Sequence, residues 1–232
     1  MMHPVDRVAI MSEPRLRSDA ARNRERLLAA GREVFAQRGL SATLNDVAHR
    51  AGVGVGTAYR RFANKEELIE AILVQQVEEL EAILREALAE SDPWTGVVSY
   101  LERSLAIQAE DRGVAQVLSG QFAPPQRFDW SRDRLAPLVN RLVDRARDAG
   151  AVRDDVTGTD LVLLQVALTA IATTAQDAPT VPDRSDVDQL YRRYLWIALD
   201  GLRPRSGDAS RLPVAPLTTL QAHVLLGSGP QD

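Results

Sequence analysis

Side chains able to bind DNA are concentrated in residues 43–62, where the chain reads TLNDVAHRAGVGVGTAYRRF. Thr57 and Tyr59 carry hydroxyl groups, and Arg60 and Arg61 carry guanidinium groups. Such groups donate hydrogen bonds to phosphate oxygens, and arginine also reads guanine in the major groove. The segment therefore predicts a nucleic-acid contact, provided that the fold presents these side chains on one face.

Small and apolar residues in the same segment predict two short helices joined by a tight turn. Ala48 allows the helices to cross closely, Gly52 supplies a left-handed turn position, and Val53 plugs the inside of the turn. Ala58 and Phe62, four positions apart, face inward from the second helix. This is the pattern of a helix-turn-helix whose second helix enters the DNA major groove. An ordinary helical hairpin fits the same spacing.

Charge is distributed unevenly along the chain. Residues 1–66 hold twelve basic and seven acidic side chains, a balance of +5, whereas the remainder holds sixteen and twenty-five, a balance of −9. Lys65, the only lysine, falls in the first turn of the next predicted helix, where a cation opposes the helix dipole. A bound phosphate would be favoured by the lysine and the helix N-terminus together. The basic end therefore indicates an anionic partner, and chance clustering of solvated charges is the alternative. For Lys65 the alternative is an ordinary solvated surface lysine.

Hydrophobic periodicity predicts an all-α chain with no strand, in which a three-helix head precedes a six-helix body. Capping signals at Thr43 and Asn64, each followed three positions later by an acidic residue, support two of the helix starts. The predicted helices are 20–38, 44–51, 55–61, 65–90, 93–109, 113–121, 129–149, 156–175 and 187–202. The expected domains are a disordered arm over 1–19, the head over 20–81, the body over 82–203 and a flexible tail over 204–232. Within the tail, the short apolar piece 217–226 is a candidate to dock as a turn of helix.

Composition argues against several classes of function. The chain has no cysteine and only three histidines, far apart in sequence, so we expect no metal site and no cofactor. No Ser/His/Asp or paired-carboxylate arrangement stands out, so an enzyme is not expected. The glycine-rich run 52–56 follows a helix rather than a strand, which argues against a nucleotide-binding loop. The N-terminus shows no secretory signal and the apolar run 161–175 falls short of the roughly 20 residues of a membrane span, so we expect a soluble cytoplasmic protein.

Three stretches of the chain resemble the DNA-binding domain of the TetR (tetracycline repressor) family of bacterial regulators. They read RERLLAAGREVFAQRGL, TLNDVAHRAGVGVGTAYRRF and NKEELIEAIL, in this order, between about residues 22 and 80. The resemblance implies a dimer that binds a palindromic operator, usually as a repressor, and that a small molecule releases from the DNA. The alternative function is a helical small-molecule-binding or interaction protein without operator binding.

The resemblance also implies which residues contact DNA. Thr43 matches a phosphate-contacting helix cap, Tyr59 a phosphate-contacting tyrosine, and Lys65 a lysine that binds phosphate from the start of the fourth helix. The implied DNA contacts are Thr43, Asn45, Val55, Gly56, Thr57, Tyr59, Arg60 and Lys65.

The start of the second helix of the motif departs from the family pattern. Gly54 stands where serine or threonine is common, so a hydroxyl contact to phosphate is missing. Val55 and Gly56 offer no side-chain hydrogen bonds to bases, although Val55 can contact a thymine methyl group and Gly56 allows close backbone approach. Arg60 is then the best candidate for guanine readout, and specificity depends on Arg60, Asn45 and DNA shape.

For the body, the resemblance implies an effector pocket among the helices from 93 to 175 and a dimer contact through 156–175 and 187–202. The helix 156–175 is apolar nearly all round, which fits a helix with one face in the body and another on a partner. An apolar effector is expected. The candidate effector contacts are Trp94, Tyr100, Leu118, Phe122, Trp130 and Leu164. Ordinary core packing is the alternative role for each of them.

Overall fold

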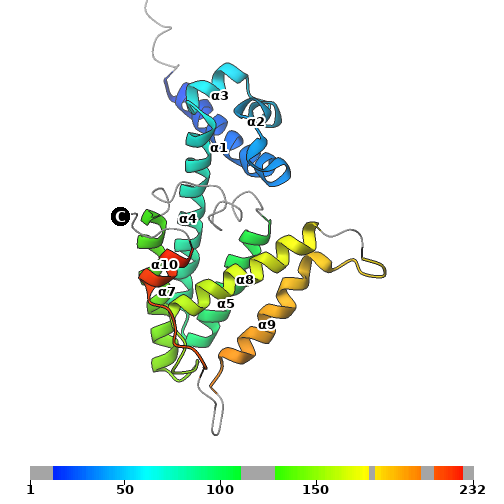
Figure 1. Ribbon diagram of the computed structural model, residues 1–232. Coiled ribbons are helices and arrows are strands. Elements are labelled where there is room, and N and C mark those ends of the chain that lie inside the picture. Colours follow the sequence, from blue (N-terminus) through cyan, green and yellow to red (C-terminus); the bar gives the residue numbers. More distant parts are fainter. Residues whose placement is uncertain (1–12, 111–128, 178–180, 205–211, 227–232) are drawn as a thin grey trace, which may run out of the picture. The chain divides into compact units, whose positions relative to one another are not determined.

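The computed structural model describes residues 13–110, 129–177, 181–204 and 212–226, and within these ranges it contains nine α-helices and no strand (Figure 1). The all-α prediction is confirmed, and the predicted helix at 113–121 lies outside the described residues. The chain divides into two compact units, residues 1–73 and 74–232, so the division falls earlier than the predicted one after residue 81. It lies inside one continuous helix, where no turn residue marks it in the sequence.

The first unit is a small helical head. It contains α1 (Glu13–Arg38), α2 (Leu44–Ala51), α3 (Val55–Arg61), the first turns of α4 (Lys65–Ala89) and a short 3-10 helix at Gly39–Ser41. Its core side chains are buried because α1, α2 and α3 each turn one apolar face inward. Gly31 permits the close packing of α1 on α4, since a Cβ atom there would lie 2.8 Å from Cδ1 of Ile72.

The first helix begins at Glu13, so the predicted disordered arm over 1–19 is wrong for residues 13–19. Pro14 lies in the first turn, where its missing N–H breaks no helical hydrogen bond. Asp19 forms an ion pair with Arg22 one turn further on, which adds local support to the helix. The remainder of the predicted arm, residues 1–12, lies outside the described residues.

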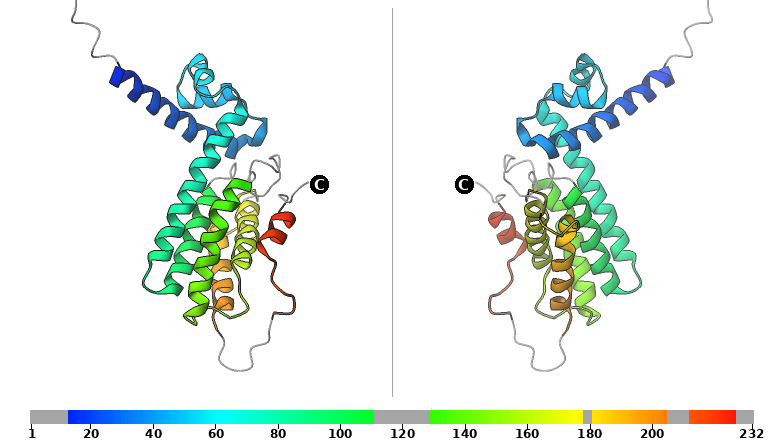
Figure 2. Two further views of the ribbon diagram at one scale, coloured as in Figure 1. Left: turned by 90° about the vertical axis from the view of Figure 1, so that its left-hand side faces the viewer. Right: turned by 90° about the vertical axis from the view of Figure 1, so that its right-hand side faces the viewer.

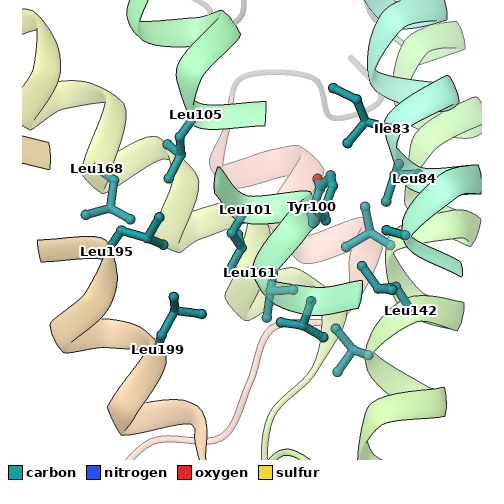
Figure 3. Close-up of a cluster of buried hydrophobic side chains, with 14 of the residues drawn as sticks. Ile83, Leu84, Tyr100, Leu101, Leu105, Leu142, Leu161, Leu168, Leu195 and Leu199 are labelled. Atoms are coloured by element: carbon teal, nitrogen blue, oxygen red, sulfur yellow. The ribbon is translucent and has the colours of Figure 1, made fainter. Parts of the chain in front are cut away.

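The second unit packs the rest of α4 with α5 (Pro93–Glu110), α7 (Asp129–Asp148), α8 (Gly158–Asp177) and α9 (Leu190–Leu202) around one apolar core. Leu101 of α5 is fully buried, and Figure 3 shows it between Leu195 of α9 on one side and Leu142 of α7 on the other. Helices α4 and α5 approach closely at Gly96, where a Cβ atom would lie 2.5 Å from the carbonyl oxygen of Ala87. The core therefore joins these five helices.

Helix α8 has the length and mean hydropathy of a membrane span, 1.4 over residues 158–176, contrary to the sequence expectation. Its polar side chains are nevertheless paired inside the body. The Tyr100 hydroxyl donates to Oε1 of Gln165 at 3.0 Å, and the Gln165 amide donates to the Ser104 hydroxyl. These pairs join α8 to α5, so α8 is a central helix of the body fold.

The C-terminal tail is packed on the body in its described part, so the predicted flexible tail over 204–232 is wrong for residues 212–226. These residues form an extended stretch followed by α10 (Thr219–Leu225), which lies beside α7 and the N-terminal part of α8 (Figures 1 and 2). Thr218 and Gln221 form a capping box that starts the helix. Helix α10 falls within the apolar piece 217–226 that the sequence analysis names as a candidate turn of helix.

Four contacts attach this C-terminal segment, residues 212–226, to the body. Asp155 accepts a hydrogen bond from the Leu212 N–H at 3.1 Å while also accepting two from the Arg153 guanidinium at 2.7 Å. The Thr159 hydroxyl donates to the carbonyl of Leu217 at 2.6 Å. The Asn140 amide donates to the Thr219 hydroxyl at 3.4 Å, and Ala222 is buried.

Candidate nucleic-acid interface

The start of α2 is fixed by a complete capping box between Thr43 and Asp46. The Asp46 N–H donates to the Thr43 hydroxyl at 3.2 Å, and the Thr43 N–H donates to the Asp46 carboxylate at 2.9 Å. The Thr43 hydroxyl in turn donates its proton to that carboxylate at 2.7 Å, which lowers the pKa of Asp46. The hydroxyl proton of Thr43 is therefore already engaged. The first helical N–H groups, of Leu44 and Asn45, have no acceptor within the helix.

The turn between α2 and α3 has the geometry that the sequence predicts. Gly52 lies in the left-handed region at φ 62°, and its N–H donates back to the end of α2. The Val53 N–H donates to the Ala48 carbonyl at 3.0 Å, and the Val53 side chain is largely buried under the turn. Arg26 of α1 donates to the Gly52 carbonyl at 3.4 Å. Periodicity alone did not assign Arg26 this role, because a contact between distant residues leaves no local signal.

Helix α3 turns one face inward and one outward, as predicted. Ala58 and Phe62 are buried, whereas Tyr59 is 48% exposed and Arg60 is exposed beside it. The Arg60 guanidinium donates to the Thr57 hydroxyl at 2.9 Å, so both side chains lie on the same outer face. The outer face of α3 therefore presents a phenol and a guanidinium to solvent.

Two glycines at the beginning of α3 leave its backbone uncovered by side chains. Gly54 is the N-cap of the helix and provides no side-chain cap. Gly56 is exposed, and a Cβ atom placed there would meet nothing within 4 Å. Val55, between them, is half-buried. The backbone at this end of α3 is accessible to a partner.

The start of α4 is capped as the sequence predicts. The Asn64 side chain accepts from the Glu67 N–H at 2.8 Å, and the Glu67 carboxylate accepts from the Ala63 N–H at 2.5 Å. Lys65 is the first residue of α4 and is half-buried. The two carboxylates of its turn, Glu66 and Glu67, offset the unfavourable position of the cation near the helix N-terminus.

The structure places all eight predicted DNA contacts in the head. Six lie on α2 and α3, Thr43 is the N-cap of α2, and Lys65 is the first residue of α4. Five are exposed and three are half-buried. The exposed set is Thr43, Asn45, Gly56, Tyr59 and Arg60, and the half-buried set is Val55, Thr57 and Lys65.

The candidate effector contacts of α5 have structural partners. Trp94 is half-buried at the start of the helix, and the Arg203 guanidinium stacks on its ring at 4.1 Å. Tyr100 is buried, and burial raises the pKa of its hydroxyl, which remains a hydrogen-bond donor to Gln165. Both residues thus join elements of the body.

Of the other four effector candidates, the structure describes the side chain of Leu164 only. Leu164 is half-buried against the body core. Leu118, Phe122 and the side chain of Trp130 lie outside the described residues. The body also has an open groove of about 620 Å³ that includes none of the six candidates. It is lined by Leu88, Pro93, Arg141, Asp144, Arg145, Asp148 and Ala149.

One buried polar side chain of the body was missed by sequence reasoning. Gln76 of α4 is 0% exposed, and neither atom of its side-chain amide has a hydrogen-bond partner among the described residues. Leaving a buried amide unpaired costs on the order of 1–3 kcal/mol. In the sequence, Gln76 reads as one polar residue among several on α4, because burial of its position depends on tertiary packing.

Comparison with known proteins matches both parts of the chain. Residues 27–72 match the family described as bacterial regulatory proteins, tetR family, and residues 92–204 match the SbtR-like transcriptional regulator C-terminal domain. The TetR transcriptional regulator SCO0520 from Streptomyces coelicolor is 30% identical, with a TM-score of 0.59, and the match covers 79% of this chain and 99% of that one.

Two curated relatives agree with this assignment. The transcriptional repressor KstR2 of Mycolicibacterium smegmatis is 26% identical over 82% of this chain and 96% of its own length. The transcriptional regulator UidR of Escherichia coli K12 is 28% identical over 61% of this chain and 74% of its own length. The chain therefore belongs to the TetR family of bacterial regulatory proteins and is a transcriptional regulator with a helix-turn-helix DNA-binding head, not an enzyme.

Proposed function

We propose that the protein is a cytoplasmic repressor that binds a palindromic operator as a dimer and is released from it by a small-molecule effector. The observation that supports it most directly is the exposed outer face of α3, which carries Tyr59 and Arg60. The same head contains the capped starts of α2 and α4. A face of this kind offers phosphate contacts on its rim and base contacts from the helix itself.

The capping box refines the proposed phosphate contacts. Because the Thr43 hydroxyl proton is engaged by Asp46, a phosphate at the start of α2 would first meet the N–H groups of Leu44 and Asn45. Thr43 then serves to position these groups. Tyr59 and Lys65 supply the further phosphate contacts, while Val55, Gly56 and Thr57 lie nearest the base edges.

A mobility-shift assay tests the regulator proposal. It measures binding of the protein to the DNA directly upstream of its own gene, repeated over a series of salt concentrations. Phosphate contacts release counterions, so the affinity should fall by orders of magnitude between about 50 and 200 mM salt. The alternative, a helical ligand-binding or interaction protein, predicts no shift at any salt concentration. A shift that is equal on operator and random DNA would contradict sequence-specific binding.

Arg60 is expected to read a base, so Arg60→Ala should weaken operator binding about 10- to 100-fold, the value of one bidentate guanine contact. Its effect on random DNA should be much smaller. Arg50→Ala is the matched control, because Arg50 is an exposed arginine of the head that pairs with Glu33 of α1. Equal loss on operator and random DNA for Arg60→Ala would assign Arg60 to phosphate instead.

The proposed dimer contact lies on α8 and α9. Large apolar side chains are exposed on both helices, by 39–56%: Val166 of α8 and Tyr194, Trp196 and Ile197 of α9. Exposed apolar patches mark sites of protein–protein contact. Only 33% of the apolar window of α8 is buried within the chain. A second copy would cover these surfaces. A monomer at micromolar concentration by light scattering would contradict the proposal.

For the effector, we propose a pocket in the body for an apolar molecule, with Gln76 as a polar contact in addition to the six candidates.

If no protein group pairs with the Gln76 side-chain amide, Gln76→Met should raise the free energy of unfolding by about 1 kcal/mol. Urea unfolding measures this. Gln75→Met, at a half-buried neighbouring position, is the control and should change stability little. Destabilisation by Gln76→Met would show that the amide is paired within the protein.

A further inference from the structure

Exposed large apolar side chains are concentrated in one part of the described chain. Eleven such side chains are exposed, and all except Tyr59 lie in α8, α9, the loop between them or the C-terminal segment. Three belong to α10: Leu220 is 61% exposed, Val224 57% and Leu225 64%. This seven-residue helix thus turns most of its apolar side chains away from the body.

The orientation of α10 is fixed by its attachments. Its capping box sets the start of the helix, and Thr159 and Asn140 bind the residues at that start. Ala222 faces the body and is 4% exposed. Leu220 and Val224, which flank it two positions on either side, therefore point to solvent.

Charge is absent from this segment. Residues 212–226 contain no Asp, Glu, Lys or Arg, although 26% of the whole chain is charged. The same is true of residues 161–176, which make up most of α8. A surface without charge is poorly suited to DNA or to an acidic or basic partner, and it suits contact with another uncharged apolar surface.

We propose that α10 is part of the surface through which two copies of this chain associate, with Leu220, Val224 and Leu225 packing on the partner subunit. The inference rests on the proposed dimer. A second copy is the occupant because Leu217, two residues before α10, accepts a hydrogen bond from Thr159 at the N-terminal end of α8. Helix α8 also carries the exposed apolar side chain of Val166, which is assigned to the dimer contact. Figures 1 and 2 show α10 beside this end of α8. Thr159 and Val166 are seven positions apart on α8 and therefore lie on the same face of that helix.

The test is the dimer dissociation constant of the full chain carrying Leu220→Ser and Val224→Ser, measured by sedimentation equilibrium. Both side chains are exposed in the single chain, so thermal unfolding of the dissociated protein should be unchanged. The dissociation constant should rise about tenfold or more, because buried apolar side chains of an interface are lost. Val214→Ser is the matched control: Val214 is 78% exposed in the same segment but lies outside α10, and this variant should dimerise like wild type.

The outcomes separate the two proposals. A wild-type chain that stays monomeric contradicts the dimer, and with it the role of α10. A wild-type dimer whose dissociation constant changes less than twofold in the double variant contradicts only the role of α10. Equal weakening by Val214→Ser would also overturn the specific role of the α10 face.

A second measurement does not depend on weakening the dimer. The chain has no cysteine, so Val224→Cys introduces a single thiol that can carry an environment-sensitive fluorophore. Dilution through the dissociation constant should shift the emission of a label at 224 to the red, whereas a label at 214 should not respond. An unchanged emission at 224, while sedimentation shows dissociation, would overturn the proposal.

Discussion

Gly96→Ala is expected to destabilise the body by about 1–3 kcal/mol, the range seen when a methyl group is forced into a packed core. The new Cβ atom would lie 2.5 Å from the carbonyl oxygen of Ala87 and 3.5 Å from Cδ1 of Leu142. The first of these atoms belongs to the backbone, so α4 and α5 must move apart to make room. Urea unfolding monitored by circular dichroism measures the loss.

Gly201→Ala is the matched control for this prediction. Gly201 lies near the end of α9, and a Cβ atom there would meet nothing within 4 Å. Because alanine loses less backbone entropy than glycine in a helix, this variant should be more stable by about 0.5–1 kcal/mol. Equal effects of the two substitutions would show that the close approach at Gly96 does not limit the packing of α5 on α4.

Gly56→Ala is expected to separate stability from DNA binding. The position is exposed and helical, with open space for a methyl group, so the free protein should be as stable as wild type or more stable by about 0.5–1 kcal/mol. If the backbone at Gly56 approaches DNA closely, the same methyl group occupies space that the DNA needs. Operator affinity in a mobility-shift titration should then fall about tenfold, or 1.4 kcal/mol.

The Gly201→Ala variant is also the control for operator binding, because it adds a methyl group in α9 of the body and not in the head. It should bind operator like wild type. Undiminished operator binding by Gly56→Ala would contradict close approach of the backbone at this end of α3, and would leave Arg60 and Asn45 as the main candidates for specificity.

The geometry of the head could be predicted from sequence because each of its features has a local cause. Thr43 and Asp46 are three residues apart in a capping box, Gly52 occupies the turn, and Ala58 and Phe62 lie four apart on the inner face of α3. All three features are confirmed. The DNA contacts themselves remain predictions, because they depend on a partner.

The features that were not predicted depend on contacts between distant residues. Gln76 is buried only through tertiary packing, and Arg26 reaches the Gly52 carbonyl across 26 positions. The order of the C-terminal segment follows from its hydrogen bonds to Asp155, Thr159 and Asn140. A stretch rich in proline reads as flexible until the surface that binds it is known.

The attachment of the C-terminal segment at Asp155 depends on the ionisation of the Asp155 carboxyl group. The Arg153 guanidinium and the Leu212 N–H lower the pKa of the Asp155 carboxyl from 3.8 to about 2. Because the pKa is lower in the folded chain, the stabilisation is complete above about pH 4 and is lost as the pH falls from there toward 2. Near neutral pH the Asp155 carboxylate therefore stays ionised, and its hydrogen bond to the Leu212 N–H does not depend on acidity in that range.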